Sequence, residues 1–354
     1  MREQSNRWTW LAVGVVLVLL LAPASGVFAK QITLTLADST APTGLRGNGV
    51  TVFVEEVEKH TNGQVKIQVH WGESLLKEKE ILPGVRDGIV DIGYINPNYY
   101  PKELLNTGAF ALFPQGPKKF TNMYWLYAKS FEEIPALKTE MERFKLKPIY
   151  TTAVLPVAVT STKPFIQFSD FSGKRIRAAS RWWLGQLKGA GAIPVSIPWG
   201  DTYMALQTGT IEGVYTNIDG IHRTKLDEVG KHIYTCRELW IGVPFIYSIN
   251  TAKWGSLPPA LQAQILKAGE AAAKRYEQMF EDEWNRIAIE QKTMGCVITA
   301  ASAADITKWV SMPVVEELRR EWQKESEAAG NKEAAAVLSK MKSLIDEALA
   351  REKN

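Results

Sequence analysis

Arg175 and Arg177, two positions apart, are the residues of this chain best suited to bind an anion. They lie in residues 174–178, where polar and apolar residues alternate, and this alternation predicts a strand with both arginines on one face. A guanidinium presents a planar fork to a carboxylate and stays charged at any working pH. Either arginine could therefore bind a carboxylate in a cleft, although spacing alone favours a surface or structural ion pair.

Several tryptophans near these arginines in the sequence could wall a ligand. A rigid indole offers a large contact area and one N–H donor. A single tryptophan is nevertheless more often part of the core than of a binding site. The candidates are Trp182, Trp183, Trp199 and Trp240.

Motifs of common enzymes and metal sites are missing from the sequence. It has no G-x-S-x-G, H-E-x-x-H, C-x-x-C or P-loop pattern. The histidines are scattered without the spacing of metal ligands, at His60, His70, His222 and His232. The sequence thus favours binding without turnover, cofactor or metal. The alternatives are a secreted enzyme acting on a small carboxylate and a scaffold or adhesion domain.

The elements around Arg177 are expected to alternate between strands and short helices. Ser180 and Asp201 are suited to cap the two helices. The expected strands cover residues 174–178, 193–197 and 210–216, and the expected helices cover 181–188 and 202–207. This order predicts an α/β fold with a mostly parallel sheet and ligand contacts at the strand ends.

The N-terminal half predicts a similar alternation. Strands are expected at residues 31–38, 65–70 and 89–95, and helices at 50–60 and 79–87. The loop at 39–49 is a candidate to face the ligand. Tyr94 and Asn96 stand at the end of the third strand, where open α/β sheets place ligand contacts.

The C-terminal part predicts long helices. One helical pattern covers residues 259–293, and at 1.5 Å per residue it spans about 50 Å, enough to run beneath two lobes. A further helix is expected over 309–349, with a break at Gly330 and Asn331.

Residues 1–29 have the pattern of a cleaved signal peptide. Arg2 and Arg7 begin it, an apolar run follows at 8–22, and small residues precede the expected cleavage after Ala29. The run is shorter than the ~20 residues of a spanning helix, and no cysteine follows it to carry a lipid. Export to the periplasm without a lipid anchor is expected, with an uncleaved membrane anchor as the alternative.

Charge and cysteine content constrain the partners only weakly. The formal net charge of +4 is too small to indicate a nucleic-acid partner. Cys236 and Cys296 could form a disulfide in an exported chain or remain two separate buried thiols, and the sequence leaves both open.

The central motifs resemble those of the substrate-binding proteins of tripartite ATP-independent periplasmic (TRAP) transporters, of the C4-dicarboxylate-binding type. The matching residues are Gly173, Ile176, Arg177, Pro198, Trp199, Gly200, Asp201, Tyr203, residues 205–209, Glu212 and Gly213. The resemblance implies a two-lobed periplasmic-binding-protein fold with a long helix spanning both lobes. It assigns residues 30–154 with 243–282 to lobe I and 155–242 with 283–354 to lobe II. The implied partners are a small organic-acid ligand and the TRAP membrane permease.

The same resemblance implies roles for individual residues. Arg177 would bind the ligand carboxylate, Asn217 or Thr216 would orient it, and Trp199 would wall the ligand. Adding the strand-end and tryptophan candidates gives the predicted site: Arg177, Asn217, Thr216, Trp199, Tyr94, Asn96, Trp182 and Trp240. Where many relatives carry a second arginine this chain has Val157, which predicts a monoanionic ligand with an apolar or aromatic far end.

Overall fold

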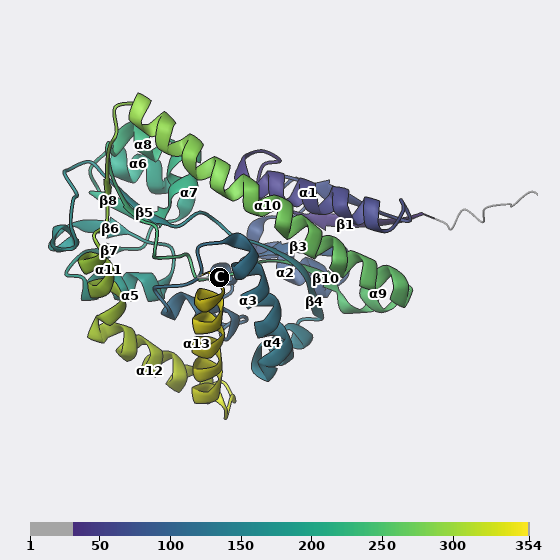
Figure 1. The fold of residues 1–354 in the computed structure, drawn as a ribbon. Coiled ribbons are helices and arrows are strands. Elements are labelled where there is room, and N and C mark those ends of the chain that lie inside the picture. The colour runs from purple at the N-terminus through teal and green to yellow at the C-terminus, as the bar shows by residue number, and fades with distance from the viewer. Residues whose placement is uncertain (1–30, 353–354) are drawn as a thin grey trace, which may run out of the picture.

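The chain folds into two lobes, each built on one β-sheet (Figure 1). The computed structural model describes residues 31–352. The first sheet has the strand order β2-β1-β3-β10-β4 and defines lobe I. Its strands are β1 (Ile32–Ala37), β2 (Val65–His70), β3 (Ile92–Ile95), β4 (Leu146–Thr152) and β10 (Phe245–Asn250). β1 is parallel to β2 and β3, and β10 is antiparallel to β3 and β4.

The second sheet has the order β11-β9-β5-β8-β6-β7 and defines lobe II. Its strands are β5 (Val157–Ser161), β6 (Arg175–Arg177), β7 (Ile193–Val195), β8 (Gly213–Asn217), β9 (His232–Cys236) and β11 (Val297–Ala300). β6 is parallel to β7 and β8, as predicted, but β5 is antiparallel to β8 and β9. The sheet is therefore mostly parallel, as predicted, and β5 alone runs the other way, because it enters directly from β4 of lobe I and not through a crossover helix.

Helices cover both faces of the first sheet, which explains its apolar strands. One face packs against α1 (Gly44–His60) and α10 (Pro259–Thr293), and the other against α2 (Glu78–Arg86) and α4 (Pro135–Arg143). Fully buried residues of these layers include Leu34, Phe53, Ile265, Ile81 and Ile246.

Short helices connect the strands of lobe II. Ser180 caps the first of them, as predicted, because its Oγ accepts a hydrogen bond from the backbone N–H of Trp182 at 3.3 Å. These helices are α5 (Arg181–Gly189), α6 (Thr202–Gln207), α7 (Ile218–Arg223) and α8 (Leu226–Val229). α3 (Phe120–Glu133) packs on α4 and β4, and its buried residues share a core with lobe II, whereas α9 (Thr251–Gly255) packs on β10 and β4.

Two N-terminal elements differ from their predicted bounds. α1 begins at Gly44, earlier than the helix predicted over 50–60, because Gly44 takes φ +77 and turns the chain into the helix. β3 begins at Ile92 rather than at residue 89, because Gly88 (φ +76) ends the preceding turn and leaves Ile89 65% exposed. The loop predicted to face the ligand is therefore shorter, and part of it is helical.

α10 (Pro259–Thr293) has 35 residues and runs along both lobes (Figure 1). It packs against α1 and β4 of lobe I and against α7 and β11 of lobe II. The crossing with α1 needs a glycine, because a Cβ on Gly49 would lie 2.6 Å from the Tyr276 ring. Arg275 of α10 adds an ion pair to Glu56 of α1, with Nη1 2.9 Å from Oε1. The predicted long helix spanning both lobes is confirmed.

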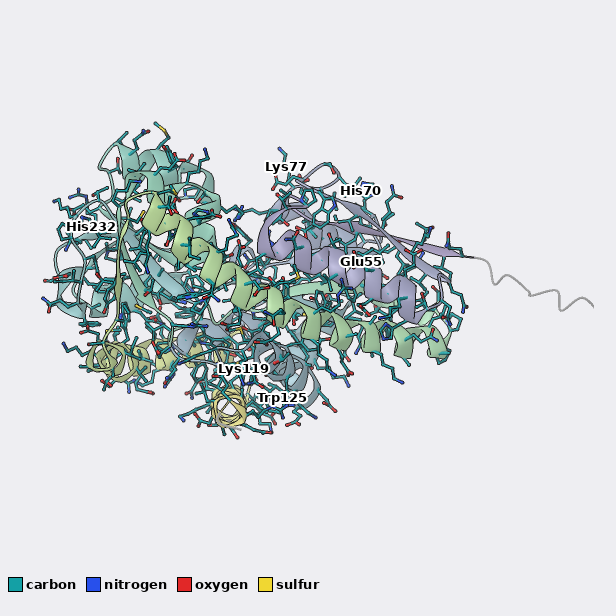
Figure 2. All side chains as sticks on the ribbon, turned by 45° about the horizontal axis from the view of Figure 1, so that its top comes forward. Glu55, His70, Lys77, Lys119, Trp125 and His232 are labelled. Carbon is teal, nitrogen blue, oxygen red and sulfur yellow. The ribbon has the colours of Figure 1, made fainter. Side chains whose placement is uncertain are left out.

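The C-terminal region forms three helices, where a single broken one was predicted. They are α11 (Ala303–Ser311), α12 (Pro313–Ala328) and α13 (Ala334–Arg351). Pro313 starts a new helix because proline cannot continue the hydrogen-bond ladder of α11. α13 packs on α3, where Glu352 accepts from the Lys119 N–H at 2.7 Å and Arg351 lies over the Trp125 ring at 4.4 Å (Figure 2).

Cys236 and Cys296 are both buried and both free. Cys236 ends β9, whereas Cys296 directly precedes β11, whose first residue Val297 pairs with His232. Because the two strands are parallel, the thiols lie about five residues apart along the sheet, or about 16 Å, too far for a disulfide. The alternative of two separate thiols is the one the structure shows.

Within residues 31–352 no helix is both long and apolar enough to cross a membrane. The predicted signal peptide lies outside the described residues.

Candidate functional site

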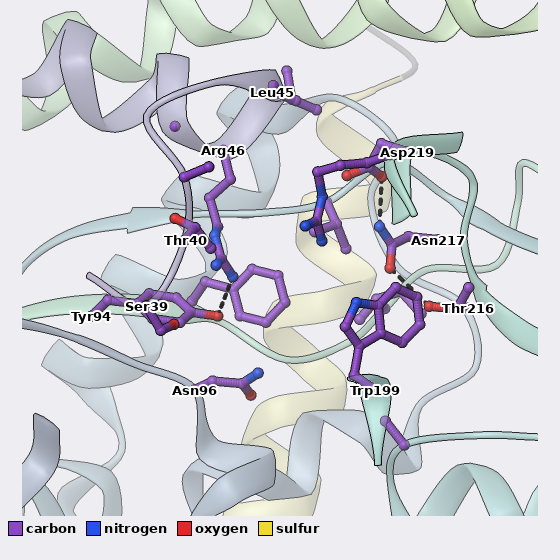
Figure 3. Close-up of a pocket in the computed structure, with 18 of the residues that line it drawn as sticks. Ser39, Thr40, Leu45, Arg46, Tyr94, Asn96, Trp199, Thr216, Asn217 and Asp219 are labelled. Carbon is purple, nitrogen blue, oxygen red and sulfur yellow. Dashed lines mark hydrogen bonds between the residues drawn. The ribbon is translucent and has the colours of Figure 1, made fainter. Parts of the chain in front are cut away.

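A cavity of about 590 Å³ lies between the two lobes. Residues directly after β1, β3, β6 and β8 line it, so the carboxyl ends of strands from both sheets meet there. Figure 3 shows Arg46, Tyr94 and Asn96 of lobe I on one side, and Trp199 and Asn217 of lobe II on the other. A ligand of small-molecule size would therefore contact both lobes at once.

Arg177 is the most unusual residue of this cavity. It ends β6, is 3% exposed, and donates from Nε to the Ile197 carbonyl at 3.0 Å. Within residues 31–352, no carboxylate lies within 4.0 Å of its guanidinium and no acceptor is bonded to either Nη. Burial lowers the pKa of Arg177 to about 10, with the Tyr99 phenol opposing the shift, so the group stays charged at neutral pH. Its two Nη groups remain free to bind an anion.

Trp199 forms the wall beside this arginine. The Arg177 Cζ lies 5.1 Å from the centre of the Trp199 ring, within the range of a cation–π contact. Trp183 of α5 also lines the cavity. Both indoles contribute to the wall on the side of lobe II.

Arg175 does not reach the cavity. It stands at the opposite end of β6, 44% exposed, where Nε and Nη2 donate to the carbonyls of Thr210 and Gly209 at 2.9 and 3.0 Å. Its Nη1 lies 3.5 Å from Glu212. Of the two roles weighed for the arginine pair, Arg175 therefore has the structural one.

Thr216, Asn217 and Asp219 form a hydrogen-bonded chain on the lobe II wall. Thr216 Oγ1 donates to Asn217 Oδ1 at 3.0 Å, and Asn217 Nδ2 donates to Asp219 Oδ1 at 2.7 Å. The backbone N–H of Leu155 donates to the same Asp219 oxygen at 3.0 Å. Burial raises the pKa of Asp219, and the bond from Asn217 opposes that shift. Asn217 keeps one N–H for a further acceptor.

Arg46 lies on the lobe I wall and contacts several other groups there. Its Nη1 donates to Tyr94 Oη at 2.5 Å, and its Cζ lies 4.1 Å from the centre of the Tyr94 ring. Its Nη2 lies 4.0 Å from the buried Asp38 carboxylate. Burial lowers the pKa of Arg46, but the charges of Tyr94, Asp38 and other nearby acids outweigh it and raise the pKa overall. Arg46 is thus held by protein groups, unlike Arg177.

Asn96 also lies on the lobe I wall. Its Oδ1 accepts a hydrogen bond from the Asn98 N–H at 3.0 Å, which caps the short helix η1 (Pro97–Tyr99). The cap presents Tyr99 at the cavity.

Six of the eight predicted site residues line one cavity: Arg177, Asn217, Thr216, Trp199, Tyr94 and Asn96. The other two lie elsewhere. Trp240 is core, since Nε1 donates to the Phe113 carbonyl at 2.6 Å and the ring stacks on Tyr127 at 5.9 Å. Trp182 lines a separate groove between α5 and α12, beneath Arg181.

Three arginines of the cavity were missed by sequence reasoning, namely Arg46, Arg223 and Arg286. Arg46 lies in a segment predicted to be a loop, and Arg223 ends a short helix that was not predicted. Val157 is fully buried in β5 opposite Asn217 and does not line the cavity. The position of Val157 therefore gives no information on the charge of the ligand, and the monoanionic ligand inferred from it stays a prediction. No periodic pattern in the sequence would have brought Arg46 and Arg223 together.

The two lobes and the cavity between them define a protein that encloses a small ligand at an interlobe cleft. The chain belongs to the bacterial extracellular solute-binding proteins, family 7, whose family model (DctP) matches residues 36–325. This is a family of solute-binding proteins rather than of enzymes. The family predicted from the central motifs is thereby confirmed.

Curated relatives cover most of the chain. The C4-dicarboxylate-binding periplasmic protein DctP of Rhodobacter capsulatus is 27% identical over 252 residues, 70% of this chain and 74% of that protein. The sialic acid-binding periplasmic protein SiaP of Vibrio cholerae is 23% identical over 260 residues, 72% of this chain and 79% of that protein.

Solved structures have the same fold. A TRAP periplasmic solute-binding protein from Desulfovibrio salexigens superposes with a TM-score of 0.74 at 24% identity, covering 90% of this chain and 96% of that one. A TRAP protein from a marine metagenome, specific for aromatic acid ligands and bound to 3-hydroxybenzoate, gives a TM-score of 0.76 at 22% identity, covering 90% and 99%.

Proposed function

We propose that this protein captures a small organic anion in the interlobe cavity and delivers it to the membrane permease of a TRAP transporter. The observation that carries the proposal is Arg177, a buried arginine without an acidic partner among the described residues, at the carboxyl end of β6. Relatives and structural neighbours whose ligands are named bind C4-dicarboxylates, sialic acid, pyroglutamate or aromatic acids. All of these ligands carry a carboxyl group.

In this proposal Arg177 holds the carboxylate through its two Nη groups. A bidentate pair of charge-assisted hydrogen bonds is strong where water is excluded. The carboxylate also offsets the free-energy cost of burying the guanidinium charge of Arg177. The free N–H of Asn217 orients the carboxylate, because the Thr216 hydroxyl proton is already given to Asn217. Trp199 and Tyr94 wall the body of the ligand.

Binding would close the cavity by a hinge motion of the lobes. We assign residues 30–154 with 243–282 to lobe I and residues 155–242 with 283–354 to lobe II. The membership of the two sheets supports this division, since β1 to β4 and β10 fall in the first set and the other strands in the second. A ligand stabilises closure only through contacts that are better in the closed state.

Binding without turnover is tested by thermal unfolding with monocarboxylates, aromatic acids and dicarboxylates. A ligand at a hundred times its Kd adds about 2.7 kcal/mol and raises the melting temperature by several degrees. Each stabilising acid is then incubated with the protein and recovered. Conversion of that acid to a product would identify an enzyme instead.

The export step is tested by the intact mass of protein from the periplasm of an expressing bacterium. We expect a chain that begins near Lys30, without residues 1–29. A full-length mass in the membrane fraction would contradict a released receptor.

A further inference from the structure

Two arginines, one from each lobe, lie near each other at the cavity. Arg46 belongs to the first turn of α1 in lobe I, and Arg223 ends α7 in lobe II, and both line the cavity. The lobes approach closely here, because a Cβ on Gly44 would lie 3.7 Å from the Arg223 Cδ. Two positive charges from different lobes therefore share one space.

The acids nearest this pair already accept hydrogen bonds from other groups of the protein. Asp38 accepts from Thr40 and Tyr247 at 2.8 and 2.9 Å and stands 4.0 Å from Arg46. Asp219 is bonded to Asn217. No carboxylate of the described chain lies within 4.0 Å of the Arg223 guanidinium.

Further features affect the charge of the same corner. Burial raises the pKa of Glu78, which lines the cavity near Arg46, and so disfavours its ionised form. The first turn of α1 has no acidic residue and no side-chain cap, so the positive end of its dipole adds to the field. Burial and the charge of Arg46 both lower the pKa of Arg223. Arg223 therefore has no close acidic partner among the described residues, and the charge of Arg46 lies beside it.

We propose that Arg46 and Arg223 together bind a second acceptor group of the ligand, so that the preferred ligand is an acid with an anionic or strongly accepting group at the end remote from Arg177. This inference rests on the proposed function, in which Arg177 holds the first carboxylate. It replaces the monoanion with an apolar far end that Val157 had predicted.

The position of the pair on two lobes gives this contact a role in closure. Without an acceptor, approach of the lobes brings two like charges together in a partly desolvated space, which opposes closing. An acceptor between them replaces one repulsion by two attractions. An acid that lacks the second group gains only the contacts of the Arg177 end, so its differential stabilisation of the closed state is smaller.

The test uses pairs of acids that differ by one group: pentanoate against glutarate, and benzoate against isophthalate. Calorimetry measures their affinities for the wild-type protein, Arg223→Met and Arg177→Met. We expect the wild type to bind the better diacid at least tenfold more tightly than its monoacid. Arg223→Met should remove most of that ratio and leave the monoacid affinity unchanged or improved. Arg177→Met should weaken both members of the pair.

Arg175→Met is the matched control, since Arg175 lies outside the cavity, and the wild-type ratio should survive in it. A ratio unchanged in folded Arg223→Met, or a wild-type preference for the monoacids, overturns this inference while leaving Arg177 as the anchor. If no acid of either pair binds, or if Arg177→Met binds as the wild type does, the proposed function fails and this inference fails with it. Melting curves of each variant confirm that it is folded.

Discussion

Arg177 and Arg46 face the same cavity from opposite lobes, yet their surroundings shift their pKa values in opposite directions. Burial lowers the pKa of Arg177, whose Nη groups have no protein partner in the described chain, whereas Tyr94 and Asp38 help to raise that of Arg46. An arginine held by a buried acid shapes the wall of the site. An arginine desolvated without a partner weakens the ligand-free fold, and an anion offsets that cost. The difference distinguishes an arginine that also stabilises the ligand-free fold from one that depends on the ligand for a partner.

The largest expected effect is on binding by Arg177→Met. Affinity for any acid that stabilises the wild type should fall at least 100-fold, about 2.8 kcal/mol, because two charge-assisted hydrogen bonds are lost. The ligand-free protein should melt close to the wild type, because the Ile197 carbonyl loses one hydrogen bond while a buried, unpaired charge is removed. The affinity of Arg177→Lys should lie between those of the wild type and Arg177→Met, because lysine keeps the charge but cannot donate two parallel hydrogen bonds to a carboxylate. Calorimetry and melting curves check this, and near-wild-type affinity would falsify the role of Arg177.

Arg46→Met should show the opposite pattern in stability. The variant leaves Asp38 buried without its nearest cation and Tyr94 Oη without its donor, so ligand-free stability should fall by about 1–3 kcal/mol. Urea unfolding of the two variants side by side measures the contrast. Equal losses in Arg46→Met and Arg177→Met would remove the distinction between the walls.

Asn217→Ala should weaken binding by about 1.5–2 kcal/mol, roughly ten- to thirtyfold. It removes a donor to the carboxylate and frees the Asp219 carboxylate beside the bound anion. Thr216→Val has nearly the same shape as threonine and serves as the control, with a smaller loss expected. A larger loss in Thr216→Val would make Thr216 the orienting residue.

Trp199→Leu should have the smallest effect, about 1 kcal/mol or roughly fivefold in affinity, from the lost ring beside Arg177. Trp240→Phe is the matched control, because Trp240 lies in the core and away from the cavity. Its affinity should be unchanged even where its melting temperature falls. If Trp240→Phe weakens binding as much as Trp199→Leu, the loss of affinity in Trp199→Leu does not come from a direct contact of Trp199 with the ligand.

The local parts of this fold were predictable from sequence because they depend on neighbours in the chain. The strand at Arg175–Arg177, the helix capped by Ser180 and the 35-residue α10 follow from alternation, capping and helical periodicity. Periodicity also placed Arg175 and Arg177 on one face. It could not show that the strand is three residues long, which leaves the two arginines at opposite ends.

The long-range parts of the site were not predictable in this way. Arg46 and Arg223 are far apart in sequence and meet only because two lobes come together at the strand ends. Trp240 and Trp199 look alike in sequence, but one packs on Tyr127 and the other stands beside Arg177. The residue type indicates which contacts a side chain can make, whereas the tertiary fold decides whether that side chain lies in the cavity.

The length of α10 also bears on how the chain unfolds. One end of this helix belongs to the core with α1, and the other end packs on α7 and β11. Unfolding of either lobe would therefore expose one end of α10 while its other end is still packed in the folded lobe. The lobes should melt as one cooperative unit, in a single transition, rather than in two steps. Heat then acts on both lobes together, and a ligand in the cavity protects the whole chain.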